Sequence, residues 1–375
     1  MYYPTTFISV AMRENHTHET QRSALSGIRR LCQWESERRI SIEDRLANGQ
    51  LLQLHEIVDL AGHVRMRRQG NKGGAISAEK FNIYWFYISR YIAWLTDTLL
   101  PDRDTIQIRK LVEDQALRLK SRELKRGASK AKKRQRVLDE KFPELARAQL
   151  LSLFTNPFQG LENSPQHHGT RLRNMVMIRI LYETGMRRGE LLSLKLKHFI
   201  EASGGEGAYL SIERNHGDEL DLRVNQPVAK TLGRDVPISA GLEQQIIDYR
   251  VIRAGLRNAG HSENSFLFCV HQAGQTEGEA LSINGFNSAF LYFRQTFPAL
   301  GKKLHPHAFR HDWNYRFSVQ ADEAGLSEDQ ENSSREQSMG WVPGSSMAKT
   351  YNLRHRREQA MAIGRKVAEL TKRPQ

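Results

Sequence analysis

The stretch LHPHAFRHDW, residues 304–313, carries the pattern on which the interpretation of the whole chain rests. Aromatic side chains recur at every fourth residue from Phe309, which predicts a helix over residues 307–317. On such a helix His307 and Arg310 lie on one side, next to the aromatic stripe. A proton carrier and a fixed guanidinium fork would then project together, a combination that suits a phosphate group. The pair alone does not decide a function, because a histidine and an arginine one turn apart usually decorate a surface.

Composition narrows the class of protein. The 375 residues suffice for two or three domains. The 56 Lys and Arg against 42 Asp and Glu give a net charge of +14, which favours a polyanionic partner. Nucleic acid is favoured over a membrane, because no strongly amphipathic basic helix stands out. No apolar run approaches the roughly 20 residues that cross a bilayer, and the first residues lack the order of a signal peptide.

The two cysteines, Cys32 and Cys269, are too far apart in the sequence to make a disulfide framework or a zinc site by themselves. We therefore expect a reducing, cytosolic compartment. No cluster of Asp, Glu and His suggests a metal site and no P-loop suggests a nucleotide, so no cofactor is expected.

The N-terminal third is expected to be helical. Residues 1–75 show helical spacing in two stretches and are interpreted as an extension of unknown role. An amphipathic helix with Ser77 as its N-cap and a second helix from Thr105 to Leu119 begin the next unit, residues 76–142.

A strongly basic run, residues 120–136, follows these helices, and Glu123 is its single acidic residue. Such a run is usually a solvated linker, but in so basic a chain DNA phosphates are the favoured partner. The candidate DNA-binding residues are Lys120, Arg122, Lys125, Arg126, Lys130, Lys132, Lys133, Arg134 and Arg136.

After Pro143 the composition changes, and residues 143–375 are expected to form a further domain. A core helix is predicted to end at Gly185, followed at once by a new helix. Arg187 then lies at the tight turn, and Glu190, one turn further, is close enough to hold its guanidinium.

A small β-section comes next, with strands predicted over residues 208–213, 220–225 and 234–238. A hairpin between the last two carries Lys230, the only lysine between positions 197 and 302. A hairpin lysine most often serves solubility, so Lys230 alone indicates no function.

Helices resume beyond residue 241, and an acidic stretch, residues 321–332, is expected as a loop or a loosely held helix. Trp341 is placed in a turn, Tyr351 follows ten residues later, and a last helix is predicted from about His355 to Leu370. The predicted fold class is mainly α with a small antiparallel β-sheet (α+β).

Taken in order, these residues resemble the tyrosine recombinase (phage integrase) family. TGMRRGELLSL, residues 184–194, is similar to the family's first box, and HAFRH, residues 307–311, to its second. Lys230 falls where the family keeps its lysine. Met339-Gly-Trp341 matches the variant in which tryptophan replaces histidine, and Tyr351 stands at the nucleophile's place. The resemblance covers about residues 145–355, while residues 77–136 look like the family's helical core-binding domain.

The resemblance implies a C-shaped clamp around DNA and a metal-free chemistry. Tyr351 would attack the scissile phosphate, and Arg187 and Arg310 would hold its oxygens. His307 would move the tyrosine proton and Lys230 would protonate the leaving oxygen. Trp341 would donate to the phosphate or pack beneath it, with Glu190 and His311 in support.

We therefore expect a site-specific DNA recombinase or integrase that acts on double-stranded DNA as a homo-tetramer, through a Holliday junction. The resemblance implies exchange of the C-terminal helix between protomers, leaves room for accessory DNA-bending proteins, and points to a bacterial cytosol and its nucleoid. The alternatives are a transposase or resolvase of the same chemistry, or a non-catalytic DNA-binding protein on this scaffold. The spacing from Arg310 to Trp341 is longer than the family's, because of the acidic stretch.

Overall fold

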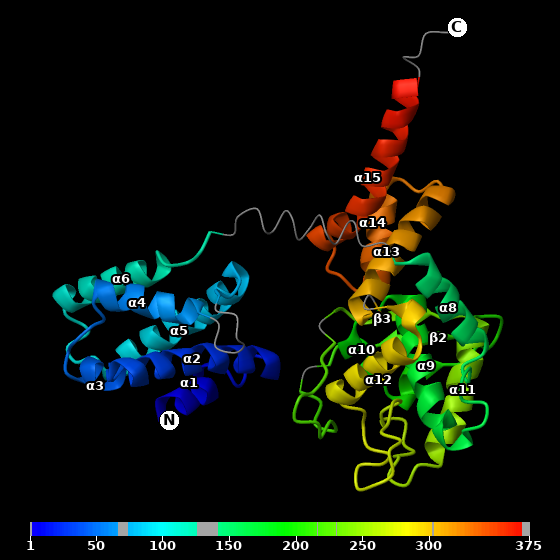
Figure 1. The fold of residues 1–375 in the computed structure, drawn as a ribbon, viewed down its shortest axis with the longest axis horizontal. Helices are drawn as coiled ribbons and strands as arrows, with labels where there is room; N and C mark the ends of the chain where they lie inside the picture. Colours follow the sequence, from blue (N-terminus) through cyan, green and yellow to red (C-terminus); the bar gives the residue numbers. More distant parts are fainter. Residues whose placement is uncertain are drawn as a thin grey trace. The chain divides into compact units, whose positions relative to one another are not determined.

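The chain forms two compact units, residues 1–134 and 135–375 (Figure 1). The structure is a computed structural model that describes residues 2–66, 74–125, 142–215, 217–229, 231–301 and 304–369, apart from the side chains of Lys349, Leu353 and Arg354. Within these residues no helix is both long enough and apolar enough to cross a membrane.

In the described part of the first unit the elements are helices, apart from an isolated β-bridge between Met66 and Ala75. Its helices are α1 (Tyr2–Ala11), α2 (His18–Arg38), α3 (Ile42–Ala47), α4 (Leu54–Arg65), α5 (Ala78–Leu99) and α6 (Ile106–Lys120). The predicted N-cap at Ser77 is confirmed, because its hydroxyl accepts a hydrogen bond of 3.2 Å from the backbone N–H of Lys80.

One hydrophobic core holds this unit together, with α2 packed along α5. Gly27 permits the close approach, since a Cβ atom there would lie 3.0 Å from the backbone oxygen of Tyr84. The core joins Phe7 and Trp34 to Trp85, and so spans both sides of residue 75. The structure thus differs from the expected division: residues 2–66 are part of the same compact unit as α5 and α6, because their apolar faces are buried against α5.

The second unit combines helices with one small sheet. Its α-helices are α8 (Glu144–Thr155), α9 (His168–Thr184), α10 (Arg188–Leu192), α11 (Ala240–Ala254), α12 (Ile283–Thr296), α13 (Pro306–Glu323), α14 (Glu328–Met339) and α15 (Ser346–Glu369). Short 3-10 helices lie at Pro165–His167, Leu196–His198 and Pro298–Leu300. The strands are β1 (Phe199–Ile200), β2 (Tyr209–Ile212) and β3 (Arg234–Pro237).

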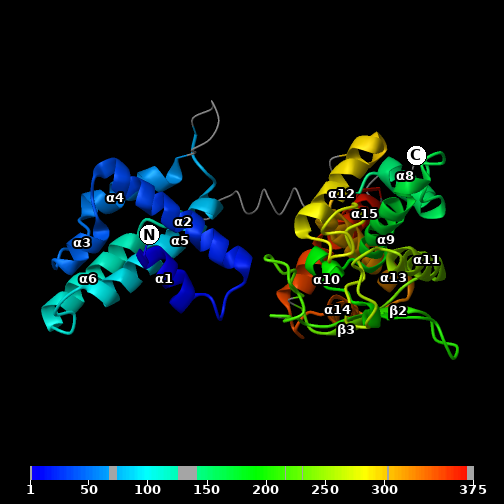
Figure 2. The same cartoon turned by 90° about the horizontal axis from the view of Figure 1, so that it is seen from below.

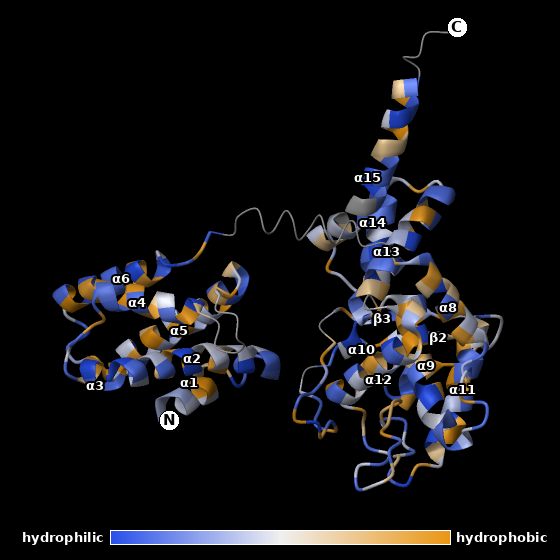
Figure 3. Cartoon of the chain, viewed as in Figure 1, coloured by the Kyte–Doolittle hydropathy of each residue, from blue (hydrophilic) through white to orange (hydrophobic). Residues whose placement is uncertain are grey.

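Helix α9 lies in the middle of this unit in both views (Figures 1 and 2). It is buried on nearly all sides, as its apolar sequence predicts, and contacts α8, α11 and α13. The hydropathy colouring shows the contrast with α15, whose distal half projects from the unit with polar and apolar residues mixed along it (Figure 3).

The sheet is antiparallel with the order β1-β2-β3, and Leu210 pairs with Val236. The fold class predicted from the sequence, mainly α with a small antiparallel sheet, is confirmed.

The strand predicted over residues 220–225 is wrong. There Asp221 and Arg223 point inward as a bidentate pair, at 2.8 Å for each contact, while Leu222 and Val224 are exposed. Polar and apolar residues do alternate along this segment, but the apolar ones face solvent. The segment pairs with none of the strands of the sheet.

Two helices near the C-terminus also differ from expectation. The acidic stretch leads into a regular helix, α14, whose first turn is closed by a capping box at Ser327. The last helix, α15, begins at Ser346 rather than near His355, so Tyr351 lies on a helix and not before one.

Candidate active site

The first part of the site is the turn between α9 and α10. Helix α9 ends at Gly185 with φ of +62°, in the left-handed region, as predicted for its C-cap. Arg187 follows as the N-cap of α10. Its backbone N–H donates to Glu190 Oε2 at 2.9 Å, and its Nη1 donates to Glu190 Oε1 at 3.2 Å. The predicted support of Arg187 by Glu190 is therefore present in the structure.

Glu190 is buried and accepts hydrogen bonds from residues in different parts of the chain. Besides Arg187, it accepts hydrogen bonds from Thr231 Oγ1 at 2.8 Å and from Arg234 Nη2 at 2.9 Å. Burial raises its pKa, but the charge and hydrogen bonds of Arg234 outweigh this and lower the pKa overall, so the carboxylate stays ionised. Arg234 also donates to the backbone oxygen of Ser338 at 2.8 Å, close to the turn that holds Trp341.

Arg310 reaches the same turn from α13. The residue is 2% exposed, and Nη1 donates to the backbone oxygen of Gly185 at 2.8 Å. Burial first, and then the positive charge of Arg187, lower the pKa of Arg310 to about 10. Within the described residues, Nε and Nη2 of Arg310 and the indole Nε1 of Trp341 are buried donors without an acceptor. Such groups are rare in folded proteins, and together they suit an anion with several oxygens.

Aromatic rings surround Tyr351. Its ring stacks on that of Trp341, with the centroids 5.4 Å apart and an interplanar angle of 19°. The ring of His311 lies 4.9 Å away, and that of His307 lies 4.4 Å beyond His311. The Cζ atom of Arg310 is 6.0 Å from the centre of the Tyr351 ring. The Tyr351 ring therefore lies near the buried guanidinium of Arg310 and in contact with the ring of His311, which in turn contacts the ring of His307.

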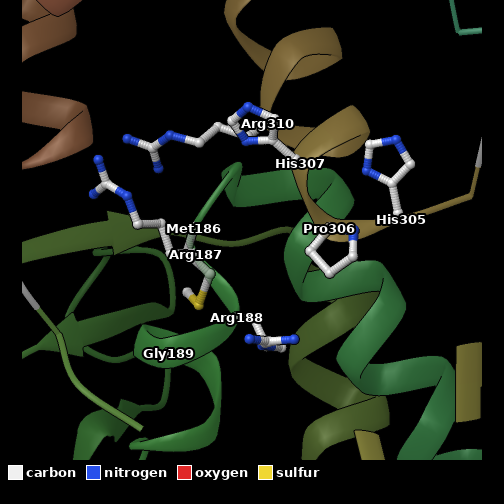
Figure 4. Close-up of a pocket in the computed structure, with 8 residues that line it drawn as sticks. All are labelled: Met186, Arg187, Arg188, Gly189, His305, Pro306, His307 and Arg310. Carbon is white, nitrogen blue, oxygen red and sulfur yellow. The ribbon is translucent and has the colours of Figure 1, made fainter. Parts of the chain in front are cut away.

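A pocket of about 370 Å³ lies between the α9–α10 turn and the start of α13, and Arg187, His307 and Arg310 line it. Figure 4 shows the guanidinium groups of Arg187 and Arg310 extended toward the same side of it, with His307 next to Arg310. Among the lining residues that were not predicted as site residues, two have basic side chains, His305 and Arg188. His305 caps α13 by accepting from the Ala308 N–H at 3.1 Å, and a polar residue just before Pro306 was the signal for it.

The structure brings together Arg187, Glu190, His307, Arg310, His311, Trp341 and Tyr351. Lys230 lies outside the described residues, although the next residue, Thr231, is bound to Glu190. Sequence reasoning missed Thr231 and Arg234, and no local pattern marks them.

Most of the basic run also lies outside the described residues, from Arg126 to Arg136. Of its first members, Lys120 and Lys125 are exposed and Arg122 is half-buried. Among the residues that the structure describes, no three or more His, Cys, Asp or Glu side chains are placed to hold a metal ion.

Comparison with known proteins indicates the protein family to which the second unit is related. Residues 145–321 match the model of the phage integrase family, so the second unit carries a domain of this family. Among solved structures, the chain is similar to the XerH site-specific recombinase bound to palindromic difH substrate in a post-cleavage complex, at 15% identity over 97% of this chain and 94% of that chain, with a TM-score of 0.46. It is also similar to the Tn1549 transposon integrase in complex with transposon right end DNA, at 18% identity over 93% of both chains, with a TM-score of 0.49. No curated protein matches the chain.

Proposed function

We propose that the protein is a tyrosine-type site-specific DNA recombinase, which cleaves and rejoins DNA through a 3′-phosphotyrosyl intermediate. The observation that carries this proposal is the position of Tyr351, whose ring packs against those of Trp341 and His311 near the buried Arg310. The family domain and the net charge of +14 support DNA as the substrate.

In the proposed reaction the Tyr351 hydroxyl attacks the scissile phosphorus while His307 takes its proton. The bond to the 5′-oxygen breaks, and Lys230 protonates that oxygen as it leaves. Negative charge grows on the non-bridging oxygens, where Arg187, Arg310 and the Trp341 N–H stabilise it. The phosphotyrosyl ester keeps the energy of the phosphodiester, so that a second 5′-hydroxyl reverses the steps on a new strand without an outside energy source.

Assembly is part of the proposal. The distal half of α15 is exposed, and Ile363 and Val367 point apolar surface at solvent at 63% and 57% exposure. With Ala360 they belong to the apolar stripe that their spacing in the sequence predicts, and we propose that this stripe docks on a neighbouring protomer; Leu370, the last residue of the predicted stripe, lies outside the described residues. Repeated head-to-tail, such a contact closes into a ring and yields a tetramer that acts through a Holliday junction. Truncation after Arg357 should then leave binding to a single DNA site intact and abolish the tetrameric complex.

Trapping of the covalent complex tests the chemistry. A DNA substrate nicked next to the cleavage site loses a short strand after attack, so religation fails and the protein–DNA ester accumulates. The unaltered chain should form this complex and Tyr351→Phe should form none. A phosphotyrosyl peptide mapped to Tyr315 would contradict the assignment, and no complex with any variant would favour the non-catalytic alternative.

Lys230 needs a separate test, because the structure does not describe it. A 5′-bridging phosphorothiolate leaves without a proton. Lys230→Ala should therefore be defective on normal DNA and recover most of its rate on the thiolate. Equal defects on both substrates would assign Lys230 to DNA contact instead.

A further inference from the structure

The acidic stretch that separates Arg310 from Trp341 ends in a buried ion pair. Glu331 and Arg335 lie one turn apart on α14, at 7% and 0% exposure, and are paired with each other. Arg335 also lies over the ring of Phe317, with Cζ 5.1 Å from its centre. A buried pair of this kind is a weak source of stability, because the loss of hydration offsets most of the attraction. A contribution to stability therefore does not explain why this ion pair is buried here.

The pair is joined to the helix that carries Tyr351. Glu331 Oε2 accepts from Asn352 Nδ2 at 2.9 Å, and Asn352 Oδ1 accepts from Ser318 Oγ at 3.2 Å. Arg335 Nη2 donates to Ser318 Oγ at 2.6 Å and closes the ring of contacts. Four buried side chains thus connect α13, α14 and α15.

Asn352 is the residue directly after Tyr351, and both are buried on α15. Neighbouring residues of a helix are separated by about 100° around its axis. An amide that is fixed on both of its polar atoms therefore fixes the rotation of α15, and with it the direction of the Tyr351 ring. Apolar packing alone does this less well, because it is not directional, whereas hydrogen bonds are.

We propose that Asn352, held by Glu331 and Ser318, is a positioning residue that aims the Tyr351 nucleophile at the phosphate clamp. The inference rests on the proposed function, in which Tyr351 attacks the phosphate. The acidic stretch then has a role: it supplies the helix from which Glu331 reaches α15.

Two reactions of the full-length chain separate aiming from folding. Cleavage of the nicked substrate needs Tyr351 and the clamp. Ligation of a strand ending in a 3′-(4-nitrophenyl) phosphate needs the clamp but not Tyr351: a 5′-hydroxyl attacks phosphorus, its proton passes to Lys230 in the reverse of the cleavage step, and 4-nitrophenolate leaves. Asn352→Ala should slow single-turnover cleavage on the order of 100-fold, the size expected for a nucleophile displaced by about 1 Å. Its ligation rate and DNA affinity should stay at the level of the unaltered chain.

A variant of the same size as asparagine distinguishes a loss of positioning from a loss of folding. Asn352→Asp keeps the size but places a second carboxylate against Glu331, and should show the same selective loss of cleavage. Adding Glu331→Gln restores one amide and one carboxylate with the same net charge, and should recover much of the cleavage rate. Tyr315→Phe is the matched control: it removes a hydrogen bond of 2.7 Å to Glu358 on the same helix, further from Tyr351, and should leave both reactions nearly unchanged.

Parallel loss of cleavage and ligation in the Asn352 variants would overturn the proposal, since the network would then hold the whole site. Undiminished cleavage in both variants would overturn it as well. An unaltered chain that performed neither reaction would instead refute the proposed function.

Discussion

The two units bury different kinds of side chain. The core of the first is built from aliphatic and aromatic residues, and its buried polar residues are Glu56, Thr96 and Gln115 within the described part. The second buries arginines on several elements: Arg171, Arg173, Arg234, Arg253, Arg310 and Arg335. Burying a guanidinium opposes folding unless it is paired or fully hydrogen-bonded. The contrast indicates that the first unit is arranged for stability and the second for holding charge in fixed positions.

Removal of a core indole from the first unit should give the largest change in stability. Trp85 is fully buried, stacks on Phe81 at 5.6 Å, and donates through Nε1 to the Leu119 oxygen at 2.8 Å. Trp85→Ala should lower the free energy of unfolding of that unit by about 3–5 kcal/mol. Chemical denaturation of the full chain measures this. Phe86→Ala, at the exposed neighbouring position, should stay within about 0.5 kcal/mol of the unaltered chain.

Removal of a buried charge from the second unit should lower the rate of cleavage and leave the stability nearly unchanged. Arg310→Met keeps a long side chain but removes the guanidinium, so cleavage should slow about 100- to 1,000-fold. The free energy of unfolding should stay about level, because removing two buried donors that lack an acceptor in the described structure offsets the loss of the hydrogen bond from Nη1 to the Gly185 oxygen.

Arg253→Met is the matched comparison. Arg253 is equally buried but donates to the backbone oxygens of Phe266 and Gly260, at 2.9 and 2.8 Å. Its removal should cost about 1–3 kcal/mol of stability by leaving those oxygens unpaired. Cleavage at temperatures where the variant is folded should be retained. A large stability loss in Arg310→Met would remove the distinction between the two arginines.

The basic run should affect affinity rather than stability. If its side chains neutralise DNA phosphates, each contact contributes about −0.9 to the slope of log affinity against log salt concentration. Replacing Lys130, Lys132, Lys133 and Arg134 together by Ala should flatten that slope and weaken binding to all sequences alike. An unchanged slope would make the run a solvated linker.

The smallest expected effect is a pH dependence confined to the second unit. Burial, followed by the charge of Arg173, lowers the pKa of His271 to about 4. The unfolded chain, with an ordinary histidine pKa of about 6.5, therefore binds more protons than the folded chain between these values. Stability should fall as the pH drops through this window, by about 1 kcal/mol at pH 5 once solvent screening is allowed for. His271→Gln should flatten the profile, and an unchanged profile would show that other groups cause it.

Much of the fold could be predicted from local pattern. The apolar spacing of α5 and α9, the cap at Ser77 and the glycine end of α9 at Gly185 all depend on neighbours a few residues apart, and the structure has them. Residues 220–225 show where the same reasoning fails. An alternating pattern shows that every second side chain points the same way, but it does not show which set faces the core. Here the inward side chains are the ion pair Asp221 and Arg223.

The candidate site residues, from Arg187 to Tyr351, could also be predicted from the sequence, because their order along the chain follows a series of short motifs. What the sequence did not contain is the set of contacts that holds them. Glu190 meets Arg234 across 44 residues, and Asn352 meets Glu331 across 21. A hydrogen bond between distant segments leaves no period in either of them, since it depends on which faces packing brings together. Local spacing therefore determined the helices and the chemistry-bearing residues, and only the packed helices decided which charges are buried, which are paired, and where the tyrosine points.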